Sequence, residues 1–411
     1  MTTLKGSCII GQSGGPTAVI NASALGAIQT ALQSENITRV FGAANGIEGV
    51  LNERLYDMGL EDPAELELLK STPASALGSC RYKMADPAVD DTDYKRLLEV
   101  FKKYDVRYFF YNGGNDSMDT CNKISKFMQQ SGYECRVIGI PKTIDNDLFG
   151  TDHCPGFGSA AKFIATSCME VQKDLCVYEK GRVTIVEIMG RHAGWLAASA
   201  SLATWAGAGP DLVYLPEINF NLDEFLEDVQ RIYNEQGKCM VAVSEGIHYA
   251  DGRFVAETGD KDVFGHSQLG GLGVMLAEIV KNKLGIKVRS IELSLLQRCA
   301  SHVASQTDID EAWAAGKAAV DAALAGQTDK MVAFERSYDA QGNYLCSTKL
   351  IGLTDVANVE KNVPRAWINA RGNGMNREFI DYALPLIQGN ATVVTENSLP
   401  RFAKLKKILA K

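Results

Sequence analysis

The sequence predicts an α/β fold in which two doubly wound, mainly parallel sheets form two domains, with the active site in the cleft between them. Apolar runs typical of buried strands alternate with helical patterns over about the first 160 residues, as expected for βαβ units. The same alternation continues after Gly156 and indicates a second sheet. The length of 411 residues also exceeds that of a typical single domain.

The first part of the chain contains three units in which a strand leads into a polar or glycine-rich loop. The predicted strands are residues 7–10, 107–111 and 137–140, and the loops after them are residues 11–16, 112–117 and 141–147. Helices are expected at 18–32 and from the second loop to about Gln130. Open α/β sheets bind ligands at the carboxyl ends of their strands, so these loops are the candidate site.

The second part of the chain repeats this organisation. Its predicted strands are residues 183–188, 212–215 and 240–243. Amphipathic helices are predicted at residues 61–70, 222–233 and 308–324.

The composition is that of a folded soluble protein, with 46% hydrophobic and 22% charged residues. A net charge of −8 argues against a nucleic-acid or acidic-membrane surface, but allows a local basic pocket for an anionic metabolite. The ten cysteines include no Cys-x-x-Cys pair, which favours free thiols over a zinc site or disulfides. Because the sequence has no signal-peptide pattern and no run of about 18 apolar residues, we expect a cytoplasmic protein without a membrane segment.

The loop at residues 141–147, with the sequence Pro-Lys-Thr-Ile-Asp-Asn-Asp, carries the most chemistry. It offers two carboxylates, an amine, a hydroxyl and an amide within seven residues. This mixture suits a site that holds a metal, an anionic phosphate and a hydroxyl that must lose a proton. The alternative is a polar turn that only caps a helix, because Thr, Asn and Asp are common at such positions.

The glycine-rich turns at 11–16 and 113–117 favour a phosphate site. Glycine lets the backbone approach a phosphate, and the start of the following helix offers unpaired N–H donors. Neither turn matches a Walker A loop or G-x-G-x-x-G, so the sequence does not support a P-loop or dinucleotide site. Each turn alone is also compatible with tight packing between a strand and a helix.

A set of short motifs resembles that of the 6-phosphofructokinases and occurs in the same order, over roughly residues 5 to 330. The motifs are Gly14-Gly15, Gly113-Gly114-Asn115-Asp116-Ser117, Pro141 to Asp147, Met189-Gly190-Arg191, Ser244-Glu245-Gly246 and Gln297-Arg298. The resemblance implies the two-domain fold of that family, fructose 6-phosphate as acceptor and Mg²⁺ as cofactor.

Two residues make the chain similar to the pyrophosphate-dependent branch of that family. Asp116 stands where the ATP enzymes have glycine, and a carboxylate there would fill the space near a nucleotide's α-phosphate and repel it. Lys142 also replaces a glycine, and its ammonium can pair with the anionic donor and the phosphate leaving group. The alternative is neutral drift in an ATP enzyme.

The resemblance also implies roles in catalysis and donor binding. Asp145 would take the proton from the sugar's 1-hydroxyl, as a weak base because Lys142 lies beside it. Thr143 and Asp147 would position substrate and metal, and Arg81 would lie near the transferred phosphoryl group. The implied donor site comprises Gly14, Gly15, Gly114, Asn115, Asp116 and Ser117, and the implied metal ligands are Asn115 and Asp147.

The implied sugar-phosphate site combines two subunits. Arg298 would bind the 6-phosphate within its own subunit, whereas Arg182 and Arg289 would reach the same phosphate from a neighbour. The chain is therefore expected to form a homodimer or larger assembly with shared active sites. Met189, Gly190 and Arg191 would line the sugar, and Glu245 would accept hydrogen bonds from its hydroxyls.

Two departures from the family pattern leave alternatives open. Asn115 replaces an aspartate that helps to hold magnesium, and Leu295 replaces a histidine that contacts the sugar phosphate. They motivate two other hypotheses: the same chemistry on sedoheptulose 7-phosphate, or a catalytically silent regulatory subunit that binds sugar phosphate.

The expected domains follow the motifs. Residues 1–156, completed by about 294–350, would bind the phosphate donor. Residues 157–293 would bind the sugar phosphate, and residues 351–411 would be an extension that packs on the core.

Overall fold

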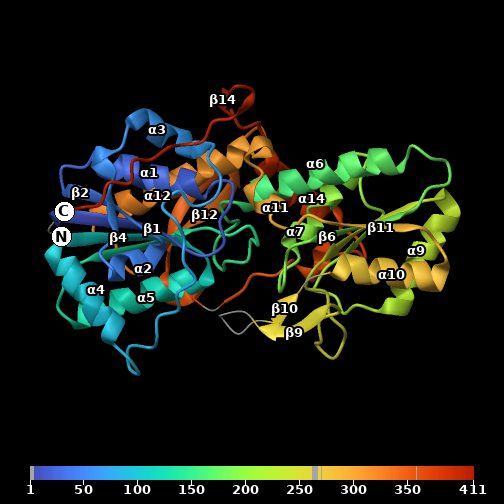
Figure 1. Ribbon diagram of the computed structural model, residues 1–411, viewed down its shortest axis with the longest axis horizontal. Coiled ribbons are helices and arrows are strands. Elements are labelled where there is room, and N and C mark those ends of the chain that lie inside the picture. The colour runs from blue at the N-terminus through green and yellow to red at the C-terminus, as the bar shows by residue number, and fades with distance from the viewer. Residues whose placement is uncertain (1–3, 262–266, 270, 358) are drawn as a thin grey trace.

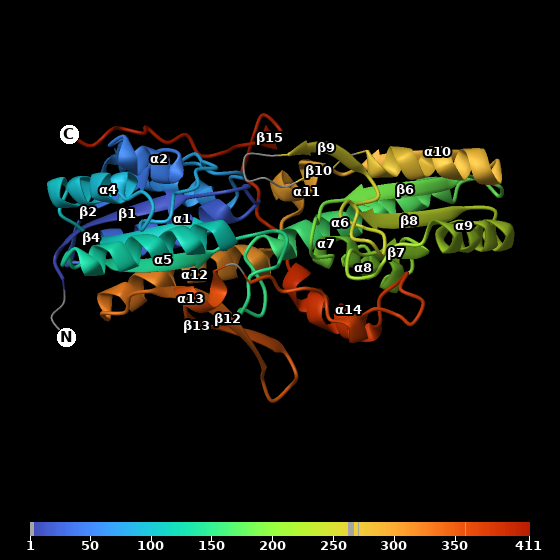
Figure 2. The same ribbon diagram turned by 90° about the horizontal axis from the view of Figure 1, so that it is seen from below.

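The computed structural model of the chain describes residues 4–411 apart from 262–266, 270 and 358. Two sheets lie in two lobes side by side, each with helices on both faces (Figures 1 and 2). The predicted α/β fold class is confirmed.

The sheet of the first lobe has seven strands in the order β13-β12-β5-β4-β1-β2-β3. The five central strands are parallel, and the two edge strands β3 and β13 pair antiparallel. The strands are β1 (Gly6–Gln12), β2 (Ile37–Ala43), β3 (Leu55–Asp57), β4 (Val106–Gly113), β5 (Arg136–Pro141), β12 (Lys330–Tyr338) and β13 (Tyr344–Gly352).

Helices cover both faces of this sheet and pack against side chains that alternate between the two faces along each strand. Ile9 packs in a cluster with α4 (Thr92–Lys103) and α5 (Asn115–Gln130), whereas Cys8 and Ile10 pack with α1 (Ile20–Leu32) and α12 (Gln306–Leu324). Successive strand residues point to opposite faces, so a run that is buried throughout must be covered on both sides.

Two glycines bring α1 and α12 into close contact. A Cβ atom on Gly26 would lie 2.0 Å from the carbonyl oxygen of Trp313, and one on Gly316 would lie 1.9 Å from that of Ser23. Only glycine allows the two helix backbones to approach this closely.

The sheet of the second lobe is parallel throughout, in the order β11-β6-β8-β7. One face packs on α9 and α10, and the other on α6, α7, α8 and α14. The strands are β6 (Val183–Ile188), β7 (Leu212–Tyr214), β8 (Cys239–Ser244) and β11 (Val288–Glu292), beside the pair β9 (Glu257–Lys261) and β10 (Ser267–Leu269). The helices are α6 (Phe157–Leu175), α7 (Trp195–Ala198), α8 (Ser201–Trp205), α9 (Leu222–Gln236), α10 (Leu272–Leu284) and α14 (Arg377–Ala383).

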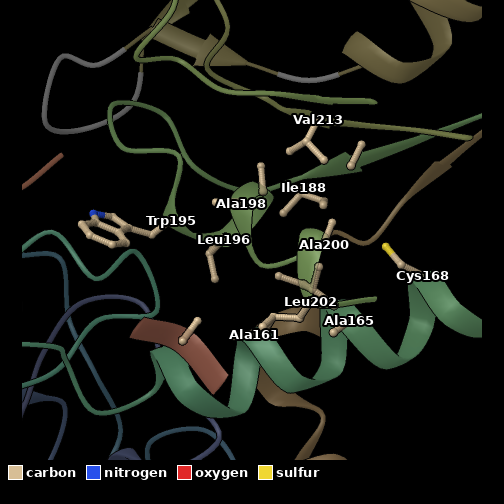
Figure 3. Packing of buried hydrophobic residues seen from close by; sticks show 14 of the residues in the cluster. Ala161, Ala165, Cys168, Ile188, Trp195, Leu196, Ala198, Ala200, Leu202 and Val213 are labelled. Carbon is tan, nitrogen blue, oxygen red and sulfur yellow. The ribbon is translucent and has the colours of Figure 1, made fainter. Parts of the chain in front are cut away.

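Small side chains let α6 lie close to the neighbouring segments of this lobe. Ala161, Ala165 and Cys168 of α6 face the region of Ala200 and Leu202 (Figure 3). The remaining short elements are α2 (Gly46–Leu51), α3 (Pro63–Glu67), α11 (Leu296–Cys299), α13 (Leu353–Val356), β14 (Thr395–Glu396) and β15 (Leu399–Pro400).

The C-terminal segment contacts both lobes. Residues 363–387 contribute Phe379, Tyr382 and Leu386 to the core of the second lobe. The chain then returns along the first lobe (Figure 2), where Leu409 forms a β-bridge with Tyr56. The boundaries of the three expected domains stay a prediction.

Most predicted elements are observed, but the helix expected at 61–70 is wrong. Only α3 (Pro63–Glu67) is α-helical there, and residues 68–70 form a 3₁₀ turn. All ten cysteines are free thiols. Among the described residues, no helix is both long enough and apolar enough to cross a bilayer.

Candidate active site

The three predicted loops meet at one edge of the first sheet. Parallel pairing sets Gln12 of β1 beside Asn112 of β4, and Gly113 of β4 beside Pro141 of β5. The backbone N–H of Lys142 donates to the carbonyl of Gly113 over 3.1 Å. These hydrogen bonds hold the glycine-rich turns against the 141–147 loop.

The first glycine turn leaves space for the charged ends of two side chains, those of Lys142 and Arg298. Lys142 Nζ donates to the carbonyl oxygen of Gly15 over 2.7 Å. A Cβ atom on Gly14 would lie 3.3 Å from Lys142 Nζ, and one on Gly15 would lie 3.0 Å from a guanidinium nitrogen of Arg298. Gly14 also has a φ of +77°, which side chains rarely adopt.

Helix α5 begins at the second glycine turn. Gly114 is its N-cap, Asp116 is exposed in its first turn and Ser117 is buried. The buried side-chain oxygen Oδ1 of Asn115 has no hydrogen-bond partner among the described residues. An unpaired buried oxygen at this edge is available to a ligand.

Thr143 holds Asp145 in the middle of the 141–147 loop. Its hydroxyl donates to Asp145 Oδ2 over 3.3 Å and accepts from the Asp145 backbone N–H over 3.0 Å. Burial raises the pKa of Asp145, although the charges of Lys142 and Arg191 oppose the change. The charge of Lys142 acts in the direction expected for a weak base, but the loss of solvation outweighs it at Asp145.

The other two ionisable groups of this loop are perturbed as well. Burial and the charge of Asp145 raise the pKa of Asp147 to about 7, and Glu360 contributes in the same direction. Burial lowers the pKa of Lys142 to about 8 against the stabilising charges of both aspartates. Ionisable groups shifted this strongly are concentrated at functional sites.

The second lobe contributes a matching set of groups. The N–H of Gly190 donates to Glu245 Oε1 over 3.3 Å, and the N–H of Met189 donates to Gln297 Oε1 over 3.2 Å. Burial raises the pKa of Glu245 to about 7, and the charge of Asp145 adds to the shift. This electrostatic coupling places the Glu245 carboxylate near the loop of the first lobe.

Three arginines fall into two groups. Arg298, half buried, has its pKa lowered by burial and by the charge of Arg81, and it interacts with Asp145. Arg182 instead pairs with Asp174 over 2.5 Å, and Arg289 is exposed on β11. Neither has a described contact with the site of its own chain, and their action on a neighbouring subunit stays a prediction.

The sequence matches the Phosphofructokinase family over residues 7–323, which is more than half of the chain. The chain belongs to the phosphofructokinase family. Within this family, it is 46% identical to the pyrophosphate--fructose 6-phosphate 1-phosphotransferase of Halomonas elongata, over 96% of this chain and 95% of that one. The enzyme of the same name from Xanthomonas campestris is 45% identical, over 98% and 97% of the two chains.

A solved phosphofructokinase has the same architecture. The crystal structure of a pyrophosphate-dependent phosphofructokinase from Marinobacter aquaeolei superposes with a TM-score of 0.88 at 43% identity, and covers 98% of this chain and 97% of that one. The fold expected from the motifs is therefore confirmed at the level of the family.

Sequence reasoning missed the C-terminal residues that contact the 141–147 loop. Asn146 Nδ2 donates to the hydroxyl of Tyr382 over 2.8 Å, and the N–H of Lys361 donates to the carbonyl of Asp147 over 2.7 Å. The first pair is 236 residues apart along the chain, and no motif links them.

Proposed function

We propose that this phosphofructokinase transfers a phosphoryl group from inorganic pyrophosphate to the 1-hydroxyl of fructose 6-phosphate, giving fructose 1,6-bisphosphate and phosphate. The gathering of Lys142, Asp145, Glu245 and Arg298 around one strand edge carries the proposal. The names of relatives that are similar over nearly the whole chain support the same reaction. The phosphoryl potentials of pyrophosphate and the product are similar, so the reaction is readily reversible.

Asp145 acts as the general base in this proposal. As the sugar oxygen bonds to phosphorus, the bridging P–O bond of pyrophosphate breaks and the carboxylate takes the hydroxyl proton. Its raised pKa makes it a stronger base than an exposed aspartate. Thr143 keeps the carboxylate in one orientation.

Lys142 and Asp116 select the donor. The Lys142 ammonium offsets the charge of pyrophosphate and of departing phosphate, while the exposed Asp116 carboxylate opposes a nucleotide at the start of α5. Gly14, Gly15, Gly114 and Ser117 provide backbone and hydroxyl donors, and Arg81 lies near the transferred group. Substitution of each of these residues tests the role assigned to it.

The residues present fit Mg²⁺ as the cofactor. The buried amide oxygen of Asn115, which has no partner in the described part of the chain, and the Asp147 carboxylate are hard oxygen ligands of the kind this ion prefers. Asn115 and Asp147 would hold the ion, which would neutralise charge on the phosphate oxygens when bound. Chelation with EDTA is expected to abolish turnover, and added Mg²⁺ to restore it.

The sugar site uses both lobes and a second subunit. Met189, Gly190 and Arg191 line the sugar, Glu245 accepts from its hydroxyls and Arg298 binds the 6-phosphate. Arg182 and Arg289 complete the site of a neighbour in a homodimer or larger assembly. We place the enzyme in the cytoplasm, because ten free thiols suit a reducing compartment.

The deciding experiment compares donors and acceptors with purified protein in a spectrophotometric assay. Turnover with pyrophosphate and fructose 6-phosphate is expected, with little or none when ATP replaces pyrophosphate. Turnover with ATP alone would overturn the donor assignment. A higher kcat/KM with sedoheptulose 7-phosphate, which the exposed Leu295 motivates, would change the acceptor. Failure to turn over unaided would instead favour the regulatory subunit.

A further inference from the structure

The segment after the family's matched region holds the backbone of the 141–147 loop. Lys361 N–H donates to the carbonyl of Asp147 over 2.7 Å, and the next residue of the loop, Leu148, forms a β-bridge with Glu360. Lys361 Nζ also donates to the carbonyl of Asp152 over 2.8 Å. The C-terminal segment therefore contacts the loop directly after its second carboxylate.

Asn146, between the two carboxylates, is the most constrained residue of the loop. It is fully buried and has a left-handed φ of +56°, which costs energy for a residue other than glycine. Its side chain is paired at both ends: Oδ1 accepts from the N–H of Cys154 over 2.9 Å, and Nδ2 donates to the Tyr382 hydroxyl over 2.8 Å. These bonds hold the unusual backbone conformation in place.

The Tyr382 hydroxyl links the 141–147 loop to the residues that follow it. It accepts from Asn146 and donates to the carbonyl of Asp152 over 2.8 Å. Its ring is fixed independently of the hydroxyl, because it lies 5.3 Å from the ring of Trp195 and under the guanidinium of Arg336 at 4.7 Å. Removal of the oxygen alone therefore leaves the ring packed while both loop contacts are lost.

We propose that Tyr382 is a positioning residue for phosphoryl transfer: through Asn146, its hydroxyl fixes the backbone from which the Asp145 and Asp147 carboxylates project. This inference rests on the proposed function of that loop. Small displacements of a reacting group have large effects on rate, so a hydroxyl remote from the substrate controls kcat while leaving substrate contacts intact.

Tyr382→Phe tests the proposal, with Tyr133→Phe as a matched control. The Tyr133 hydroxyl also lies near two backbone carbonyls, those of Phe101 at 3.0 Å and Val106 at 2.9 Å, but in another part of the first lobe. In Tyr382→Phe we expect kcat to fall on the order of 10- to 100-fold. KM for both substrates should change by less than about threefold, because ground-state contacts are kept. The control should keep its kcat.

Hydrogen exchange gives a readout that does not depend on activity. Backbone amides of residues 144–154 should exchange faster in Tyr382→Phe than in the wild type, and not in Tyr133→Phe. Unchanged kcat in Tyr382→Phe, or an equal loss of kcat in both variants, would overturn the inference. Wild-type protein without turnover would overturn the proposed function instead, while the exchange experiment would still test the loop contact.

Asn146→Gly separates the positioning role from backbone strain. It also provides the test if Tyr382→Phe does not fold. Glycine accepts the left-handed φ without cost but makes neither side-chain hydrogen bond. We expect a loss of kcat at least as large as in Tyr382→Phe, because Asn146→Gly also removes the bond to Cys154. The double variant should lose less than the two single effects combined, because both changes remove the same Asn146–Tyr382 hydrogen bond. If Asn146→Gly retains wild-type kcat, the amide only supplies a tolerated conformation and Tyr382 has no positioning role.

Discussion

At the scale of single residues, the partly buried carboxylates of the 141–147 loop dominate the site. Asp145 and Asp147 are two positions apart, and the charge of Asp145 raises the pKa of Asp147. The Lys142 ammonium lies beside them and offsets part of this repulsion. The loop is thus arranged to accept a second cation and an anionic donor together.

Asp145→Ala is expected to reduce turnover by roughly 10²- to 10⁴-fold, the usual contribution of a general base. Fructose 6-phosphate should still bind, because its 6-phosphate is held by the arginines rather than by this carboxylate. Steady-state kinetics and calorimetric titration with the sugar phosphate measure the two effects. Near-wild-type turnover would remove Asp145 as the base, and lost sugar binding would reassign it to the acceptor site.

At the scale of elements, a charged cluster links β12 and α12 to the residues after the 141–147 loop. His153 is buried and contacts Asp152 through Nδ1 over 2.8 Å and Glu311 through Nε2 over 2.7 Å. Arg336 pairs with the same Asp152 over 2.9 Å. Burial alone would lower the pKa of His153, but the two carboxylates outweigh it and raise the pKa.

This cluster predicts a pH dependence of stability. A histidine whose pKa is raised on folding contributes fully below its unfolded pKa of about 6.5, and the contribution is lost as pH rises through the folded pKa. Between about pH 6 and about pH 9, the wild type should lose more of its free energy of unfolding than His153→Gln, which does not titrate. Urea unfolding at both pH values measures this difference. Parallel losses in the two proteins would exclude His153 as the cause.

At the contact between α1 and α12, replacing a glycine by alanine is expected to destabilise the protein, although the same change usually stabilises a helix. Gly→Ala in an open helix stabilises by about 0.5–1 kcal/mol. Gly316→Ala should instead destabilise by roughly 1–3 kcal/mol, because its Cβ would meet the Ser23 carbonyl at 1.9 Å. Denaturation measurements check this, with Lys317→Ala on the exposed side of α12 as the control. A more stable Gly316→Ala would mean that the helices separate without cost.

Local patterns accounted for most elements and for part of the site. The run at 183–188 is observed as β6 with the same limits, because an apolar β-rich segment buried on both faces has few other options. The prediction of one helix over 61–70 failed because the α-helix that begins at Pro63 ends at Glu67. The 141–147 loop was recognisable as a candidate site because its ionisable and polar groups are adjacent in sequence. The contact of Tyr382 with Asn146 was not, because no local spacing encodes a pair 236 residues apart.

At the scale of the whole molecule, the proposed sharing of active sites between subunits predicts that two inactive variants restore each other. In a mixed dimer of Asp145→Ala and Arg289→Ala, one site has both defects and the other has neither. Random mixing should therefore recover about one quarter of wild-type activity. Co-refolding or subunit exchange followed by assay measures this recovery. If the mixture stays inactive although mixed dimers form, Arg289 does not act across subunits.

The order of strands also determines when the protein can fold during synthesis. β5 pairs on one side with β4 and on the other with β12. Ile138 of β5 can therefore pair with Lys330 only after β12 has been synthesised. The second lobe is also incomplete until Phe379 and Tyr382 emerge to cover its core. A nascent chain thus carries an unpaired edge of β5 until β12 has been made, and an open apolar face on the second lobe until α14 has been made. Unpaired strand edges and exposed apolar faces promote aggregation, and in this protein β12 and α14 cover them late in synthesis.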